Sequence, residues 1–224
     1  MTNIVQIIMW ILAFVPAIVL HEMGHAVAAY KLGDPTAKRN GRISFNPIRH
    51  IDPFGTVLLP LLLVLANMPV FGYAKPVPYN PRYFKEPKKG ELIVGLAGPA
   101  ANLVQALAGA LIAFVIYLVV PASEFYYASP LNYVMSFLYM YVQVNLFLMF
   151  FNIIPIPPLD GSSIFAFILP RKYLNSYYKI QQWAMPVFMI VLILLPRFIG
   201  FSPFGWYLGV TAGNLSNLLF SFLG

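Results

Sequence analysis

Apolar residues are gathered into long runs along the chain, and short loops between the runs hold most of the charged residues. Three runs, over residues 4–30, 92–120 and 131–154, are long enough for helices that cross a bilayer, which takes about 20 residues. Two shorter runs, over residues 183–195 and 204–223, predict a closing pair of helices. The pattern predicts an all-α polytopic membrane protein.

The apolar stretch over residues 54–71 differs from these runs, because it is short and contains Pro60 and Pro69. It lies between two basic loops, residues 31–53 and 72–91, and the positive-inside rule places both loops on the cytoplasmic side. We therefore interpret the stretch as a re-entrant element; a short true span that violates the charge rule is the alternative. With it, the chain has about five to six transmembrane or re-entrant helical segments.

The first basic loop also contains a short alternation of polar and apolar residues, Gly41–Phe45, which is typical of a strand. We expect a small β element there, at the cytoplasmic face. The first apolar run ends without a small-residue cleavage site, which predicts a retained span. Because the basic loop after it lies on the cytoplasmic side, the chain is expected to start outside. The whole chain, residues 1–224, is expected to form one membrane-embedded domain, with a core at about 4–169 and the closing pair at about 180–223.

Composition supports this class of protein and excludes others. Of the 224 residues, 60% are hydrophobic and only 9% are charged, which leaves too little polar surface for a soluble globule. There is no cysteine, so disulfides, thiolate metal sites and cysteine nucleophiles are excluded. The net charge of +7 is spread over short loops, where the positive-inside rule explains it, and we expect no nucleic-acid partner.

The strongest chemical signal is the sequence His21-Glu22-Met23-Gly24-His25, at the end of the first predicted span. Residues four apart share one helix face, so both imidazoles can bind one metal ion. Glu22 can then take the proton of a water held at that metal, as in metal-assisted hydrolysis. Ionisable groups inside a span are costly unless they are paired or used, which favours function over a simple helix cap.

Two histidines leave a catalytic zinc one protein ligand short. Asp160 is the strongest candidate for the third ligand, because the third long run brings it to the membrane face that holds the histidines. The prolines before Asp160 prevent regular helix and allow the chain to bend into the site. Two alternatives stay open: Asp160-Gly161 is an ordinary turn, or His50, in the basic loop beside Asp52, is the ligand.

Two amides accompany these residues in the apolar runs. Asn102 and Asn152 could each donate to a developing oxyanion or hold the backbone of a bound peptide. Hydrogen bonding between helices is the alternative for both.

Three motifs in order, His21-Glu22-Met-Gly-His25, Gly98-Pro99-Ala-Ala-Asn102 and Asn152-x-x-Pro155-x-Pro157-x-Leu159-Asp160-Gly161, give the chain a resemblance to the site-2 protease family of intramembrane zinc metalloproteases. The resemblance covers roughly residues 12–167. It implies one Zn²⁺ per chain on His21, His25 and Asp160, with Glu22 as the catalytic acid and base. It also supports Asn102 and Asn152 as substrate-binding or oxyanion-supporting residues.

The basic loops resemble those of a compact bacterial branch of that family, so we expect no PDZ or CBS domain. In relatives, strands from this region pair with an unwound substrate. We therefore expect hydrolysis of a peptide bond in or near a transmembrane segment of a membrane-protein substrate. We expect a prokaryotic plasma membrane and an active site toward the cytoplasm. The rivals are a catalytically silent homologue that binds transmembrane helices and a metal transporter; the oligomeric state stays open.

Overall fold

Three helices in the computed structural model, which describes residues 4–65, 72–125 and 129–223, are long and apolar enough to cross a membrane. They are α1 (Ile4–Lys31), α4 (Pro87–Val119) and α5 (Pro130–Asn152). These helices confirm the three long predicted spans. Helix α4 starts at Pro87 rather than Leu92, because proline is favourable at the first helical position, where its missing N–H is not needed.

The shorter helices complete an all-helical fold. They are α2 (Thr36–Arg39), α3 (Leu59–Leu65), α6 (Ser162–Ile168), α7 (Arg171–Gln181), α8 (Ala184–Ile199), α9 (Pro203–Leu208) and α10 (Asn214–Leu219). A π-helical turn, Gly209–Gly213, joins α9 to α10. Helices α7 and α8 are bent by 61° at their junction, so they give at most one further span. Five to six spanning or re-entrant segments are thus not confirmed: the described chain has three candidate spans, or four with this bent pair.

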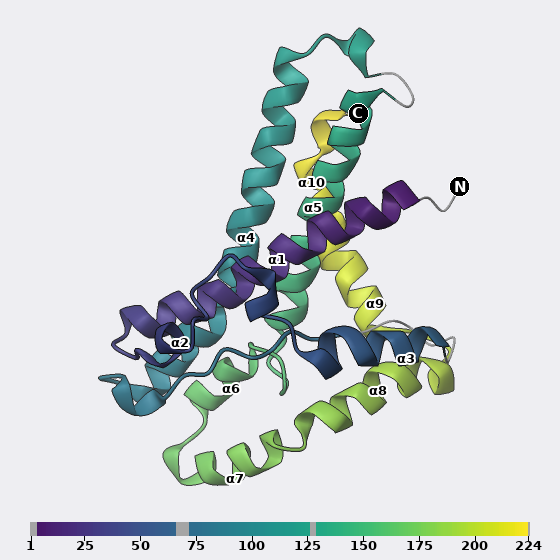
Figure 1. The fold of residues 1–224 in the computed structure, drawn as a ribbon. Helices are drawn as coiled ribbons and strands as arrows, with labels where there is room; N and C mark the ends of the chain where they lie inside the picture. The colour runs from purple at the N-terminus through teal and green to yellow at the C-terminus, as the bar shows by residue number, and fades with distance from the viewer. Residues whose placement is uncertain (1–3, 66–71, 126–128, 224) are drawn as a thin grey trace.

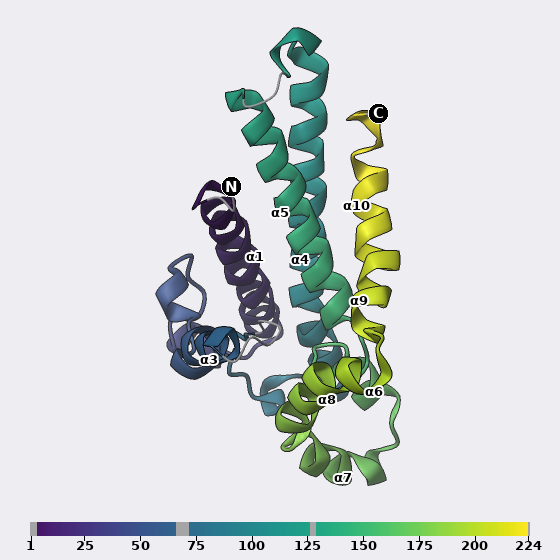
Figure 2. The same ribbon diagram turned by 90° about the vertical axis from the view of Figure 1, so that its right-hand side faces the viewer.

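Helices α4 and α5 run side by side in opposite directions, and α1 crosses them (Figure 1). The α9–α10 rod lies along α5 (Figure 2), and a cluster of small and apolar residues fills the space between these elements. Helices α6, α7 and α8 lie at the end of the bundle opposite the α4–α5 connection. The C-terminal end of α1 and the N-terminal end of α4 point toward that same end, so the polar loops gather there.

Helices α1 and α4 approach closely because a glycine stands at their contact. A Cβ on Gly24 would lie 2.6 Å from the carbonyl oxygen of Ala97 and 3.1 Å from the Cβ of Ala101. Without hydrophobic driving force in lipid, helices associate through such close backbone packing. The contact sets the HExxH face of α1 directly against α4.

The β element predicted at Gly41–Phe45 is not formed in the described structure, where this stretch consists of turns and bends. Residues 72–79 are extended, and the N–H groups of Tyr73 and Lys75 donate to the carbonyls of Gly55 and His50. Pro76 and Pro78 have no N–H, so a continuous ladder cannot form. In the stretch 41–45, the backbone N–H of Arg42 donates to the carbonyl oxygen of Ala37 in α2.

The stretch predicted to re-enter begins with a π-helical turn, Pro53–Leu58, followed by α3. Asp52 caps the turn by accepting from the N–H groups of Phe54 and Gly55. The apolar helix Pro53–Leu63 is too short to cross a bilayer alone, and residues 66–71 lie outside the described residues.

A buried carboxylate, Asp34, ties the two basic loops together just past the end of α1. Its Oδ1 accepts from the backbone N–H and hydroxyl of Thr36, and its Oδ2 accepts from the N–H of Asn80 at 2.6 Å. Burial alone would raise the pKa of Asp34, but these hydrogen bonds hold it below its ordinary value of 3.8. The chain leaving α1 and the chain entering α4 thus share one anchor.

Replacing that anchor by Asp34→Ala is expected to destabilise the protein by about 2 kcal/mol, because buried donors lose a charged acceptor. The exposed Glu124→Ala is the matched control and should leave the thermal midpoint in detergent unchanged. Since the folded pKa is lowered, the difference between wild type and Asp34→Ala should be full above about pH 4 and shrink as the pH falls through it. A pH-independent difference would contradict the role of the carboxylate.

Candidate metal centre and active site

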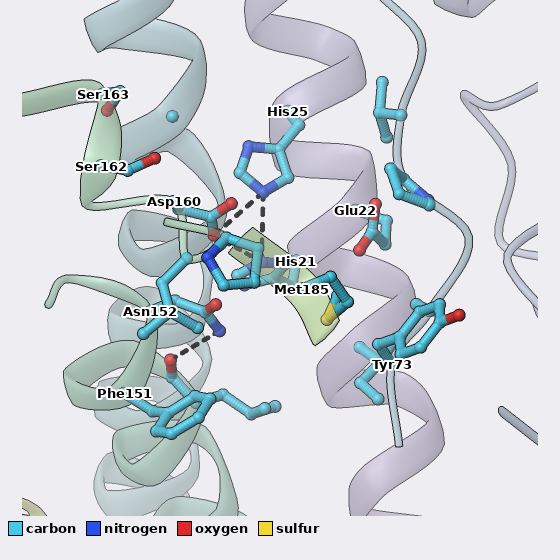
Figure 3. Close-up of a pocket in the computed structure, with 18 of the residues that line it drawn as sticks. His21, Glu22, His25, Tyr73, Phe151, Asn152, Asp160, Ser162, Ser163 and Met185 are labelled. Atoms are coloured by element: carbon cyan, nitrogen blue, oxygen red, sulfur yellow. Dashed lines mark hydrogen bonds and ion pairs between the residues drawn. The ribbon is translucent and has the colours of Figure 1, made fainter. Parts of the chain in front are cut away.

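Two histidines of α1 lie one helical turn apart and turn toward the same point. The Nε2 atoms of His21 and His25 are 3.1 Å from each other. Asp160, from the loop between α5 and α6, completes the group, with its Oδ2 3.0 Å from His21 Nε2 and 3.3 Å from His25 Nε2. Figure 3 shows the three side chains converging. Among the residues that the structure describes, this is the one group of three or more acidic or imidazole side chains that could hold a metal ion.

The orientation of both imidazole rings is set by acceptors on α4. His25 Nδ1 lies 2.7 Å from the carbonyl oxygen of Val94, and His21 Nδ1 lies 2.6 Å from Asn102 Oδ1. A carbonyl oxygen can only accept, so each Nδ1 donates its proton, and in the neutral ring each Nε2 then carries a free lone pair. This outer hydrogen bond on a metal-binding histidine fixes its tautomer and raises the basicity of the other nitrogen.

The amide of Asn102 is itself held in one orientation. Its Nδ2 donates to the carbonyl of Ala17 at 3.2 Å and to Asn145 Oδ1 at 2.9 Å, while Asn145 Nδ2 donates to the Tyr141 carbonyl. Both asparagines are fully buried. These hydrogen bonds leave Asn102 Oδ1 facing His21. Asn145 of α5 therefore helps to orient His21 by fixing the Asn102 amide of α4.

The three converging atoms fit a metal ion. With both rings neutral, two imidazole nitrogens and one carboxylate oxygen meet as acceptors, and the buried Asp160 Oδ2 accepts no hydrogen bond from the described residues. Such electron pairs repel one another unless a cation lies between them. Donor atoms around a tetrahedral zinc, with bonds of about 2.0 Å, stand about 3.3 Å apart. Three protein ligands and an open fourth position are the pattern of a catalytic zinc site.

The space beside the histidines exists because α4 has a glycine at this level. A Cβ on Gly98 would lie 2.3 Å from His25 Nε2 and 2.6 Å from His21 Nε2. Any side chain there would fill the position toward which the two nitrogens point. Gly98, which belongs to a motif of the sequence resemblance, thus leaves room for an ion rather than only for helix packing.

The loop before α6 brings Asp160 to the histidines. Helix α5 ends at Asn152, and the prolines that follow prevent its continuation. The chain turns back so that the Gly161 N–H donates to the Asn152 carbonyl at 2.6 Å, and the Ser163 N–H donates to the Asp160 carbonyl. These bonds hold the carboxylate at the metal centre, in the position that the sequence predicts for the third ligand.

Glu22 lies beside the histidines at the edge of a cavity of about 850 Å³. Figure 3 shows its carboxylate on the same helix, with Tyr73 of the extended segment nearby. Most of the lining residues are aromatic or apolar, and they come from several elements, including Phe14 of α1, Phe147 of α5 and Met185 of α8. The extended segment 72–79 lines the same cavity. The centre therefore opens into a space that suits an apolar chain.

The other predicted site residues lie in different places. Asn152 lines the cavity, and its Nδ2 donates to the Leu148 carbonyl. Asn102 does not line the cavity, so its placement favours orienting His21 over contact with a substrate. His50 is buried away from the metal group, and its Nε2 lies 2.8 Å from the Ser44 carbonyl.

Sequence reasoning missed two contributors to this site. Asn145 is one of several amides in the third apolar run, and only the structure shows that its Oδ1 accepts from Asn102, the residue that orients His21. Arg42 is one of the arginines in the first basic loop, residues 31–53, and its Nη2 lies 3.9 Å from Glu22 Oε2. One arginine among many in a basic loop gives no signal of such a contact.

A helix-borne HExxH sequence with a carboxylate beside its two histidines, set among helices long and apolar enough to span a membrane, indicates a membrane-embedded metallohydrolase. The model of peptidase family M50 matches residues 9–195. YwhC of Bacillus subtilis is 34% identical over 183 residues, which is 82% of this chain and 79% of the relative. Rip2 of Mycolicibacterium smegmatis is 29% identical over 188 residues, 84% of this chain and 66% of the relative.

A third relative is Zinc metalloprotease MJ0392 of Methanocaldococcus jannaschii, 32% identical over 170 residues, which is 74% of this chain and 35% of the relative. YwhC and Rip2 are named as candidate zinc metalloproteases. No solved structure matches. The chain belongs to peptidase family M50, the site-2 protease family. It is a multi-pass membrane protein and a metalloendopeptidase with zinc as its cofactor.

The glycine at the centre gives a direct test of the ion's position. Gly98→Ala places a methyl group where the histidine nitrogens point, so the purified variant should lose most of its zinc, as measured by metal analysis. Gly209→Ala is the matched control, since nothing lies within 4 Å of its added Cβ, and it should keep its zinc. Full zinc content in Gly98→Ala would show that the ion binds elsewhere.

The outer hydrogen bond on His21 should tune metal affinity. Asn102→Leu removes the acceptor for His21 Nδ1, and loss of such a partner weakens metal binding about 10- to 100-fold. Competition with a chelator measures this change. Gln143→Leu, an amide of α5 that lines a separate cavity, is the control and should leave zinc affinity unchanged. Equal affinity in both variants would rule out the orienting role of Asn102.

Proposed function

We propose that this chain hydrolyses a peptide bond in or near a transmembrane segment of a membrane-protein substrate. The observation that carries the proposal is the position of the HExxH face, which lies within a spanning helix and beside an apolar cavity lined by an extended chain segment. His21, His25 and Asp160 are the proposed zinc ligands. A soluble substrate would not require apolar walls at this depth.

Zinc held by His21, His25 and Asp160 would supply a Lewis acid able to polarise the scissile carbonyl and to lower the pKa of water to near neutral pH. Glu22 then acts as the general base and acid: it takes a proton from the attacking water and gives it to the leaving amine. Its place on the turn between the two histidines puts the carboxylate beside the reacting atoms. Asn152, on the cavity wall, is the amide in position to donate to the substrate or the oxyanion.

The extended segment 72–79 is the proposed docking edge for an unwound substrate. One side of the segment is tied through Tyr73 and Lys75 to the preceding loop, while the segment as a whole lines the cavity. A helical substrate hides its peptide bonds, so pairing with an extended edge would expose the scissile carbonyl. This keeps the expected role of the region without requiring a formed sheet in the protein itself.

Charge supports a cytoplasmic position for the site. Every one of the 14 Lys and Arg residues lies within residues 31–89 or 171–197. These segments belong to the end of the bundle that holds α6, α7 and α8 (Figure 1), whereas the α4–α5 connection carries Glu124 and no basic residue. The positive-inside rule then places the metal end toward the cytoplasm, and we propose a prokaryotic plasma membrane.

The proposal is tested with Glu22→Gln. Wild type and variant, both purified with zinc, are compared on a panel of single-span model substrates. Wild type is expected to cut, and the variant to be slower by about 10²- to 10⁴-fold while retaining zinc, because the general base is lost. If neither protein cuts any substrate although both hold zinc, the rival of a silent helix-binding homologue gains support. Zinc flux through vesicles would support the transporter instead.

A further inference from the structure

Arg42 is a buried arginine that the chemistry above does not use. Only 3% of its surface is exposed, although it belongs to a loop whose other basic residues are mostly solvent-exposed, Arg49 among them. An arginine is rarely buried to this degree unless a partner holds it. The burial therefore needs an explanation in the side chain's contacts.

The guanidinium lies between two elements of the site. Its Nη2 donates to the carbonyl oxygen of Lys75, in the extended segment that lines the cavity, and the same atom lies 3.9 Å from Glu22 Oε2. Arg42 Nε and Nη1 are buried and find no hydrogen-bond partner among the described residues. Two buried donor atoms without acceptors lower the stability of the fold, so the position of Arg42 is not explained by stability alone.

The distance between the Arg42 guanidinium and the Glu22 carboxylate determines how the two groups can interact. At 3.9 Å the two groups attract as opposite charges, but the distance is too long for a hydrogen bond. The carboxylate oxygens are thus not occupied by the arginine and can still meet water and a leaving amine. In a poorly hydrated site this attraction is much stronger than in water.

We propose that Arg42 is a positioning residue for Glu22: the Lys75 carbonyl holds the guanidinium in place, and its charge holds the Glu22 carboxylate at the metal centre. The inference rests on the proposed hydrolysis and extends it to a residue outside the HExxH sequence. It predicts that the basic loop takes part in catalysis through one side chain, not only in setting membrane orientation.

The test compares Arg42→Met, Arg42→Lys and Arg49→Met in the zinc-loaded protein, using a substrate that the wild type cuts. Arg42→Met should lower kcat about 100-fold, the cost of a misplaced catalytic group, with KM and zinc content nearly unchanged. Arg42→Lys keeps the charge and should recover most of that loss. Arg49→Met, an exposed arginine of the same loop, should match wild type.

Two results would overturn the inference. Wild-type kcat in Arg42→Met would show that Glu22 does not depend on the arginine. Loss of zinc together with activity, without rescue by lysine, would show a purely structural role. If wild type itself cuts nothing, the proposed hydrolysis fails, and a second measurement still decides the pairing.

That second measurement is a double-mutant cycle on the thermal midpoint. Glu22→Gln leaves a buried arginine without its anion, and Arg42→Met leaves a carboxylate without its cation, so the double variant should lose less than the sum of the two single losses. Additive losses would show that the side chains do not interact.

Discussion

The two hydrogen bonds from the histidine Nδ1 atoms to α4 are the constraint on which the rest of the site depends. In the neutral rings, these bonds keep the proton on Nδ1 and leave the lone pair of each Nε2 free. Without them, either ring could present an N–H toward the centre, and the lone pairs of His21, His25 and Asp160 would not converge. The close contact of α1 with α4 therefore shapes the chemistry as well as the fold.

Within three turns, helix α4 contributes a carbonyl acceptor, a side-chain amide and a glycine without a side chain to the site. Val94 and Asn102 orient the rings, and Gly98 between them leaves the space toward which the nitrogens point. None of the three is among the atoms that could bind an ion. A helix that only packs against α1 would need small residues at this contact. It would not need hydrogen-bond acceptors for the histidine rings at positions 94 and 102.

Much of this could be predicted from the sequence, because its strongest signals are local. The spacing of His21 and His25 fixes their shared face, and apolar runs of sufficient length predict α1, α4 and α5. The convergence of Asp160 follows from counting crossings. Their assignment as zinc ligands stays a prediction until metal is measured on the variants.

What the sequence could not predict depends on contacts between distant segments. The alternation at Gly41–Phe45 is typical of a strand, but no partner strand forms beside it in the described part of the chain, and the prolines of the extended segment remove donors that a ladder needs. Arg42 resembles the other basic loop residues until the fold buries it. The part of the expected re-entrant stretch at residues 66–71 lies outside the described residues.

The sharing of the centre between helices limits how a substrate can arrive. The histidines belong to α1 and their orienting partners to α4, so a rigid-body tilt of one helix against the other would break both ring contacts at once. A bulky substrate must therefore enter without moving α1 relative to α4. Helices α7 and α8 form part of the cavity wall yet contribute nothing to the ion-binding group. A displacement of that wall would leave the three side chains of the ion-binding group in place.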